Sequence, residues 1–172
     1  MRTLLAVCLF CVPLSACSAK KPVADLAFSH FKKAGDAYEV GFKSNIDLDA
    51  LYASEKDEKV VSRRLICALD KDRDFSVNHS LQKYLRGEIA PLAQKQPSTY
   101  SYLAHADFYK SFDNDTTRQY IDERELAEIL SKTPEIACKV VMTVYMKSPY
   151  YSATMLIPAG EILKVISPAN SK

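Results

Sequence analysis

The chain has 172 residues, of which 48% are hydrophobic and 26% are charged, the proportions of an ordinary globular protein. Its formal net charge of +2 is too small for a protein that binds nucleic acid chiefly by neutralising phosphates. The presence of only 4 glycines argues against a glycine-rich phosphate-binding loop, a collagen-like repeat or a flexible linker.

The N-terminal segment has the pattern of a targeting signal. Arg2 precedes an apolar run over residues 3–14, which is too short to cross a bilayer of about 30 Å as a helix. The run ends in Leu14-Ser15-Ala16-Cys17, which resembles the lipobox of bacterial lipoprotein precursors. The resemblance implies that residues 1–16 are a signal peptide that is removed and that Cys17 carries fatty acyl chains. An ordinary secretory signal cut nearby, or a buried N-terminal helix, is the alternative.

The same resemblance predicts where the protein resides. Residues 17–22 would form a short lipidated tether to the bilayer, and residues 23–172 would form one domain. In enterobacterial lipoproteins a residue other than Asp after the lipidated cysteine permits export to the outer membrane, and Ser18 occupies that position. We therefore expect a lipid-anchored protein of the outer membrane whose body faces the periplasm.

The remaining cysteines agree with that compartment. Cys8 and Cys11 leave with the signal and Cys17 carries lipid, so Cys67 and Cys138 remain. Two thiols in an oxidising periplasm are expected to form a disulfide, which requires their Cα atoms to lie within about 7 Å. Two separate buried thiols are the alternative.

Periodicity in the first half predicts helices and strands in alternation. Apolar residues at helical spacing indicate a helix over 23–34, and alternation over 38–42 indicates a strand. Residues 45–52 are typical of a short capped helix. The apolar run 65–69 favours a strand, with a helix as the alternative. A further helix is expected to begin near Ser76 and to end or distort at Pro91.

The second half predicts mainly strands. Residues 99–103 indicate a strand, and Asp122 with Glu125 indicates the start of a helix that stops before Pro134. Strict alternation over 136–146 is the clearest strand pattern, and turns then separate two more strands, 151–157 and 161–166. The expected fold is a two-layer α+β domain, with an antiparallel C-terminal meander packed against several helices.

The charged residues give no recognisable catalytic or metal-binding motif. Acids alternate in the run 70–74 as in a calcium-binding loop, but Phe75 and Leu81 stand where such a loop needs Gly and Glu, so a solvated turn is the simpler reading. His30, His79 and His105 lack the spacing of zinc ligands. Three glutamates, at positions 123, 125 and 128, could supply a hydrolase carboxylate pair, but helix capping explains them more simply. We predict no catalytic residue, metal or cofactor.

Tyrosine is the compositional oddity of the second half of the chain. Amphipathic rings suit either a recognition surface or packing between strands. Pro149, Tyr150 and Tyr151 form the segment most expected to be exposed, because a turn does not easily hide two rings. We take these three residues as the candidate partner surface.

These observations favour a binding protein over an enzyme. The leading hypothesis is a non-enzymatic outer-membrane lipoprotein that binds another envelope component, as an accessory or chaperone of a secretion or surface assembly. Its partners would be the bilayer, through the acyl chains, and a protein of the envelope. The alternatives are an immunity or inhibitor lipoprotein directed against a toxin or hydrolase, and a cell-envelope hydrolase.

Overall fold

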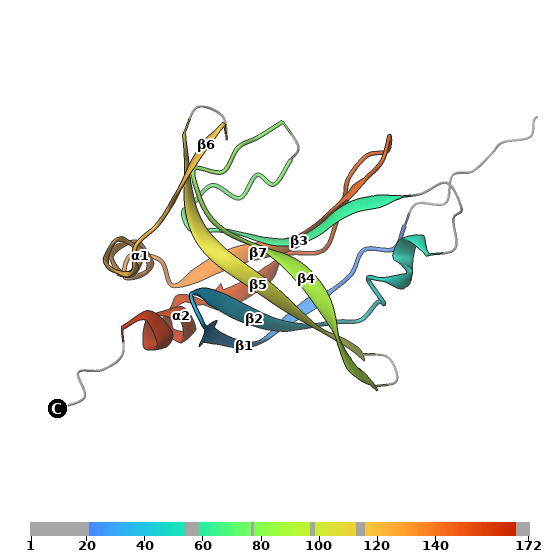
Figure 1. Cartoon of the computed structure of the whole chain (residues 1–172), viewed down its shortest axis with the longest axis horizontal. Helices are drawn as coiled ribbons and strands as arrows, with labels where there is room; N and C mark the ends of the chain where they lie inside the picture. The colour runs from blue at the N-terminus through green and yellow to red at the C-terminus, as the bar shows by residue number, and fades with distance from the viewer. Residues whose placement is uncertain (1–20, 54–58, 77, 97–98, 113–115, 168–172) are drawn as a thin grey trace, which may run out of the picture.

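The computed structural model describes residues 21–53, 59–76, 78–96, 99–112 and 116–167. Within them the chain forms one nine-stranded antiparallel sheet that is strongly curved (Figure 1). The strands are β1 (Leu26–Ala34), β2 (Ala37–Ser44), β3 (Val60–Ala68), β4 (Lys83–Gln96), β5 (Thr99–Phe112), β6 (Thr117–Tyr120), β7 (Glu135–Val144), β8 (Tyr150–Tyr151) and β9 (Met155–Pro158).

Helices are a minor part of the described chain. They are the short 3-10 helix η1 (Ala50–Tyr52), α1 (Glu123–Leu130) and α2 (Ala159–Ile166). Helices α1 and α2 lie together at the end of the sheet opposite η1 (Figure 1). Among the described residues, no helix combines the length and apolar character needed to traverse a bilayer.

The sheet nearly closes on itself. Its strands follow the order β1-β2-β5-β4-β3-β7-β8, with β6 added to β5 and β9 added to β7. The two edges meet through the segment before β1, where the Ala153 N–H donates to the Ala24 carbonyl at 2.8 Å. The Ala24 N–H in turn donates to the Tyr150 hydroxyl at 2.7 Å, and that hydroxyl donates to the Pro22 carbonyl at 3.1 Å.

The inner face of the curved sheet holds the core. Alternate residues of each central strand point inward, for example Leu65 on β3, Leu85 on β4 and Phe108 on β5. Leu126 of α1 and Ile162 of α2 are also buried in this core. Because side chains alternate between the two faces of a strand, the neighbouring residues face outward, where the candidate site lies.

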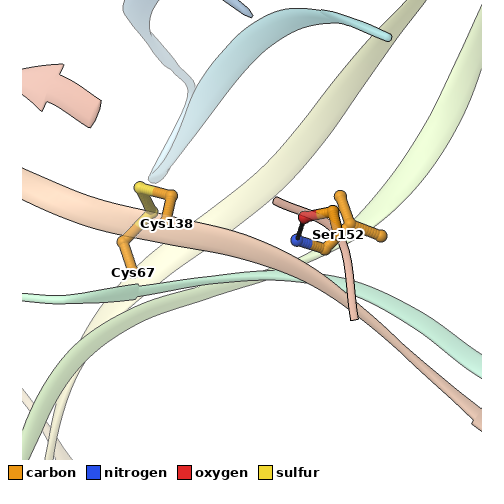
Figure 2. Close-up of a disulfide and its surroundings, with 4 residues drawn as sticks. Cys67, Cys138 and Ser152 are labelled. Atoms are coloured by element: carbon orange, nitrogen blue, oxygen red, sulfur yellow. Dashed lines mark hydrogen bonds between the residues drawn. A yellow bond between two sulfur atoms is a disulfide. The ribbon is translucent and has the colours of Figure 1, made fainter. Parts of the chain in front are cut away.

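The predicted disulfide between Cys67 and Cys138 is confirmed. The two residues are direct partners in the pairing of β3 with β7, with Cα atoms 3.9 Å apart, and both side chains lie in the core (Figure 2). Nearby, the buried Ser152 hydroxyl accepts from the Val140 N–H at 2.9 Å and donates to the Ala153 carbonyl at 2.8 Å. The bridge therefore connects β3, in the middle of the sheet, to β7, with which β8 and β9 pair.

The expected α+β fold with several packed helices is wrong, since the described chain is mostly antiparallel sheet. The segment expected to be a helix over 23–34 is largely β1. A β-bulge between Phe28 and His30 shifts the register against β2. Phe28 and Phe31 therefore both face the core although they are three residues apart, which is the spacing of a helix.

A second expected helix, from Ser76 towards Pro91, is β4 after a loop. Leu85 faces the inner core, whereas Tyr84 faces outward and is buried with Leu81 and Ala68 in a separate small cluster. Both faces of this part of β4 are therefore covered. Apolar residues therefore occur at both odd and even positions, so the alternation of apolar and polar residues that marks a strand is lost.

Two further expectations fail at the ends of elements. The segment 161–166, expected to be a strand, is helical and belongs to α2, where Ile162 and Ile166 are buried one turn apart. The capped helix expected over 45–52 is reduced to η1. Short apolar runs fit either structure, so the local pattern does not distinguish the two.

Other local predictions are confirmed. The runs 38–42, 65–69, 99–103 and 136–146 lie largely in β2, β3, β5 and β7, and β7 ends two residues earlier than predicted, at Val144. Asp122 caps α1 by accepting a hydrogen bond from the Glu125 N–H at 2.8 Å. The Asp122 pKa is lowered, chiefly by this hydrogen bond, as expected for a carboxylate at a helix N-terminus.

A pair of glycine substitutions tests the close packing of the sheet. A Cβ at Gly87 would collide with the His105 carbonyl and with Ala106 on the neighbouring strand, whereas the three atoms nearest to a Cβ at Gly41 all belong to the movable ring of His30. We expect Gly87→Ala to lower the free energy of unfolding by about 2–3 kcal/mol, and Gly41→Ala by less than about 1 kcal/mol. Urea unfolding measures both, and equal losses would contradict this packing.

Candidate functional site

The candidate binding site is a groove on the outer face of the sheet. Its floor is formed by outward-facing side chains of β3, β4 and β7, namely Ile66, Tyr84, Arg86, Val141 and Thr143. One wall is the loop that joins β3 to β4, and the other is formed by Pro149 and Tyr151. The cavity has a volume of about 200 Å³.

The groove is mostly apolar and has a polar rim. Phe75 and Leu81 of the loop pack against the outward-facing Tyr84 and Ile66, which forms a small hydrophobic cluster outside the main core. The Lys139 ammonium lies 5.9 Å from the centre of the Phe75 ring. Four polar residues of the loop also line the groove, namely Asp74, Ser76, His79 and Ser80. A mostly apolar lining with a few polar groups is typical of a binding site.

Three aspartates at alternate positions hold the loop that forms one wall of the groove in a fixed conformation. Asp70 accepts a hydrogen bond from the Asp72 N–H at 3.0 Å, and Asp72 accepts one from the Asp74 N–H at 3.1 Å. Asp74 in turn accepts one from the Ser76 N–H at 2.8 Å. Each carboxylate thus makes a turn with the backbone two residues further on. This use of the carboxylates favours the solvated-turn reading of the run 70–74 over a calcium loop.

His79 contacts two aspartates of its own loop. Its Nε2 lies 2.5 Å from Asp72 Oδ2, and its Nδ1 lies 3.9 Å from Asp74 Oδ2. The hydrogen bond to Asp72, helped by the negative charges of Asp72, Asp74 and Asp70, raises the His79 pKa. The same hydrogen bond lowers the Asp72 pKa. The ring is thereby held against two carboxylates of its own loop.

A second depression lies beside the groove and shares Arg86 with it. Its volume is about 250 Å³, and it is lined by charged residues of both signs on β3, β4, β5 and β6. Arg64 contacts Glu88 at 2.5 Å, and Arg86 stands opposite Asp107 in the register of β4 and β5. Cross-strand pairs of opposite charge are the ordinary pattern of a solvated sheet face, so we assign no ligand to this depression.

The predicted partner surface is only partly exposed. Pro149 and Tyr151 line the groove, and Tyr151 is half-buried. Tyr150 is buried instead, because its ring points into the core and its hydroxyl binds the segment before β1. Burial raises the Tyr150 pKa. The turn hides this ring because neighbouring residues of a strand face opposite sides of the sheet.

Other sequence-predicted residues lie away from the groove or outside the described residues. Cys17 and Ser18 belong to the latter group. Glu123 accepts hydrogen bonds from Lys33 at 2.7 Å and from Tyr38 at 3.2 Å, and Glu125 pairs with Lys110 at 2.8 Å. These two carboxylates therefore attach α1 to β1, β2 and β5.

The remaining histidines lie on the outer face of the sheet, His30 on β1 and His105 on β5. The His30 ring covers Gly41, and His105 Nδ1 lies 3.9 Å from Glu39. Across the part of the chain that the structure describes, there is no group of three or more His, Cys, Asp or Glu residues that could hold a metal ion.

Sequence reasoning missed most of the groove. The sequence pattern predicts a strand at Ile66 and a helix at Tyr84, and it marks Phe75 only as a mismatch to a calcium loop. The only local signal was the adjacency of Tyr84 and Leu85, which indicates a strand covered on both faces. The loop that covers the outer face comes from tertiary structure, and no periodicity reports it.

The chain matches no protein-family model, no curated protein and no solved structure.

The His79 contact predicts that the loop is more ordered in acid than in base. Because the folded-state pKa of His79 is raised above its ordinary value of 6.5, the pair stabilises the loop fully below that value and is lost as pH rises through the folded pKa. On the acid side it is lost as pH falls through the lowered Asp72 pKa.

Amide hydrogen exchange over residues 74–81, corrected for intrinsic rates, measures this effect. We expect protection to fall as pH rises above about 6.5 in the wild type, and to be independent of pH in His79→Gln over the same range. The same pH dependence in both proteins would show that His79 does not hold the loop.

Proposed function

We propose that this protein is a non-enzymatic lipoprotein of the bacterial outer membrane that binds another envelope protein in the groove. The observation that carries the binding role is the groove itself, an apolar depression bounded by an ordered loop and by Tyr151. The lipobox-like Leu14-Ser15-Ala16-Cys17 supports the anchor. The Cys67–Cys138 disulfide fits an oxidising compartment.

The size of the groove favours a protein partner over a small molecule. Its volume of about 200 Å³ is below the roughly 300–1,000 Å³ that is usual for small-molecule sites. A cavity of this size suits one large side chain of a partner, inserted between Phe75 and Tyr151. Aromatic residues and arginine are enriched at protein interfaces, and Tyr84, Tyr151 and Arg86 supply both here.

The local chemistry favours binding over hydrolysis. Both ring nitrogens of His79 face carboxylates, and the buried Ser152 hydroxyl is used in backbone hydrogen bonds. Asp70, Asp72 and Asp74 each accept a backbone hydrogen bond. The polar groups near the groove thus order the loop that shapes it.

Site-specific photo-crosslinking in living cells tests the binding role. A benzoylphenylalanine replacing Tyr151 should form a discrete adduct with an envelope protein, because its ring lines the groove. The same replacement at Tyr120 is the matched control, since that side chain is 70% exposed on β6 and lies outside the groove. Adducts of the same size and yield at both positions, or none at Tyr151, would contradict the proposal.

A second pair of variants tests the groove floor. Val141→Arg should reduce the Tyr151 adduct at least about tenfold, because a charge enters an apolar contact. Leu156→Arg, on the exposed side of β9, should leave the adduct unchanged. A secretion or assembly component in the adduct supports an accessory role, and a toxin or hydrolase supports the inhibitor role. Thermal melting of both variants reports whether each is folded.

A further inference from the structure

One end of the molecule carries an exposed apolar tip, which we define as Val61, Tyr145 and Met146. Their side chains are 61%, 63% and 88% exposed. Tyr145 and Met146 follow β7 in the hairpin that leads to β8, and Val61 lies in the β-bulge near the start of β3. The Tyr145 N–H donates to the Lys59 carbonyl at 2.9 Å, so the hairpin and the start of β3 are adjacent.

Folding does not explain the tip. Met146 is almost fully exposed, so it contributes little hydrophobic stabilisation to the core. Its φ of 53° lies in the left-handed region, which disfavours residues other than Gly and Asn. An apolar side chain that is both exposed and held in an unfavourable backbone conformation points to a role outside the fold.

Two lysines lie next to the apolar tip in the sequence. Lys59 precedes β3, Lys147 follows Met146, and both are exposed. Apolar side chains flanked by lysines are typical of segments that lie in the headgroup region of membranes with anionic lipids.

The N-terminal end of the described chain lies at the same end of the molecule as the apolar tip (Figure 1). The Lys21 ammonium sits 4.8 Å from the centre of the Tyr52 ring, and the segment that follows is held by the Tyr150 hydroxyl. Asp25 is also held, because its N–H donates to Asn45 Oδ1 at 2.8 Å. The chain is therefore fixed to the body from about Pro22 onwards.

This fixed start limits the distance from the proposed lipid. Four residues after Cys17 reach Lys21, and a fully extended chain spans at most about 3.6 Å per residue, or about 14 Å in all. If Cys17 is acylated, as the proposed function states, Lys21 cannot lie farther than that from the lipid-bearing residue.

We propose that the apolar tip inserts into the headgroup region of the bilayer that anchors Cys17. The inference rests on the proposed lipid anchor and adds a second, reversible contact. It also orients the groove, because Thr143 on its floor and Pro149 on its wall flank the hairpin that carries the tip. The groove would then open close to the membrane surface, where it could bind an envelope protein.

Tryptophan fluorescence tests this contact, since the chain contains no tryptophan. Met146→Trp and Val61→Trp place a single reporter on the apolar tip. Tyr120→Trp is the control, because Tyr120 is 70% exposed and pairs with Tyr109, at the end of the sheet away from the tip. Each full-length variant is purified from membranes and reconstituted into phosphatidylethanolamine–phosphatidylglycerol vesicles with and without brominated acyl chains.

The expected result is quenching by brominated lipid of at least about twofold at positions 146 and 61, and little change at position 120. Vesicle flotation is measured on the same samples. Protein that floats but shows no quenching at either tip position overturns the inference and leaves the anchor intact. Protein that carries no acyl chains and does not float overturns the anchor and this inference together.

Discussion

The pairing of Cys67 with Cys138 is the constraint on which the rest of the structure depends. β7 joins the sheet through β3, and the strands β8 and β9 join it through β7. The covalent bridge fixes the two cysteines opposite each other and inside the core, so every second residue on both strands also faces inward. A slip of one residue would exchange the two faces of β7.

The groove follows from this register. With Cys67 and Val140 inside, Ile66 and Val141 must face outward, where they form part of the groove floor. Elsewhere on the outer face, opposed charges such as Arg64 with Glu88 keep the sheet solvated. The groove is apolar only where the loop after β3 covers the sheet, and that loop is ordered by its own aspartates and His79.

The sequence predicted features that depend on neighbours along the chain or on simple chemistry. The Asp122 cap, the alternation of β7 and the pairing of the two remaining cysteines are of this kind. It failed where tertiary structure changes the pattern. A bulge gave the apolar residues of β1 the spacing of a helix. On β4, a loop buries Tyr84 on the outer face while its neighbour Leu85 is buried on the inner face. For the same reason Tyr151 was found as a site residue whereas Phe75 was not, since Phe75 reaches the site only through that loop.

The proposed lipid anchor at Cys17 and the proposed contact of the apolar tip would together place the groove beside the membrane. The most direct test of this account is mass spectrometry of a non-reduced digest of the native protein extracted from membranes. The account predicts an N-terminal peptide that begins at Cys17 with the added mass of acyl chains, and a linked pair of peptides containing Cys67 and Cys138. A mature N-terminus elsewhere without acyl chains, or free thiols at positions 67 and 138, would contradict it.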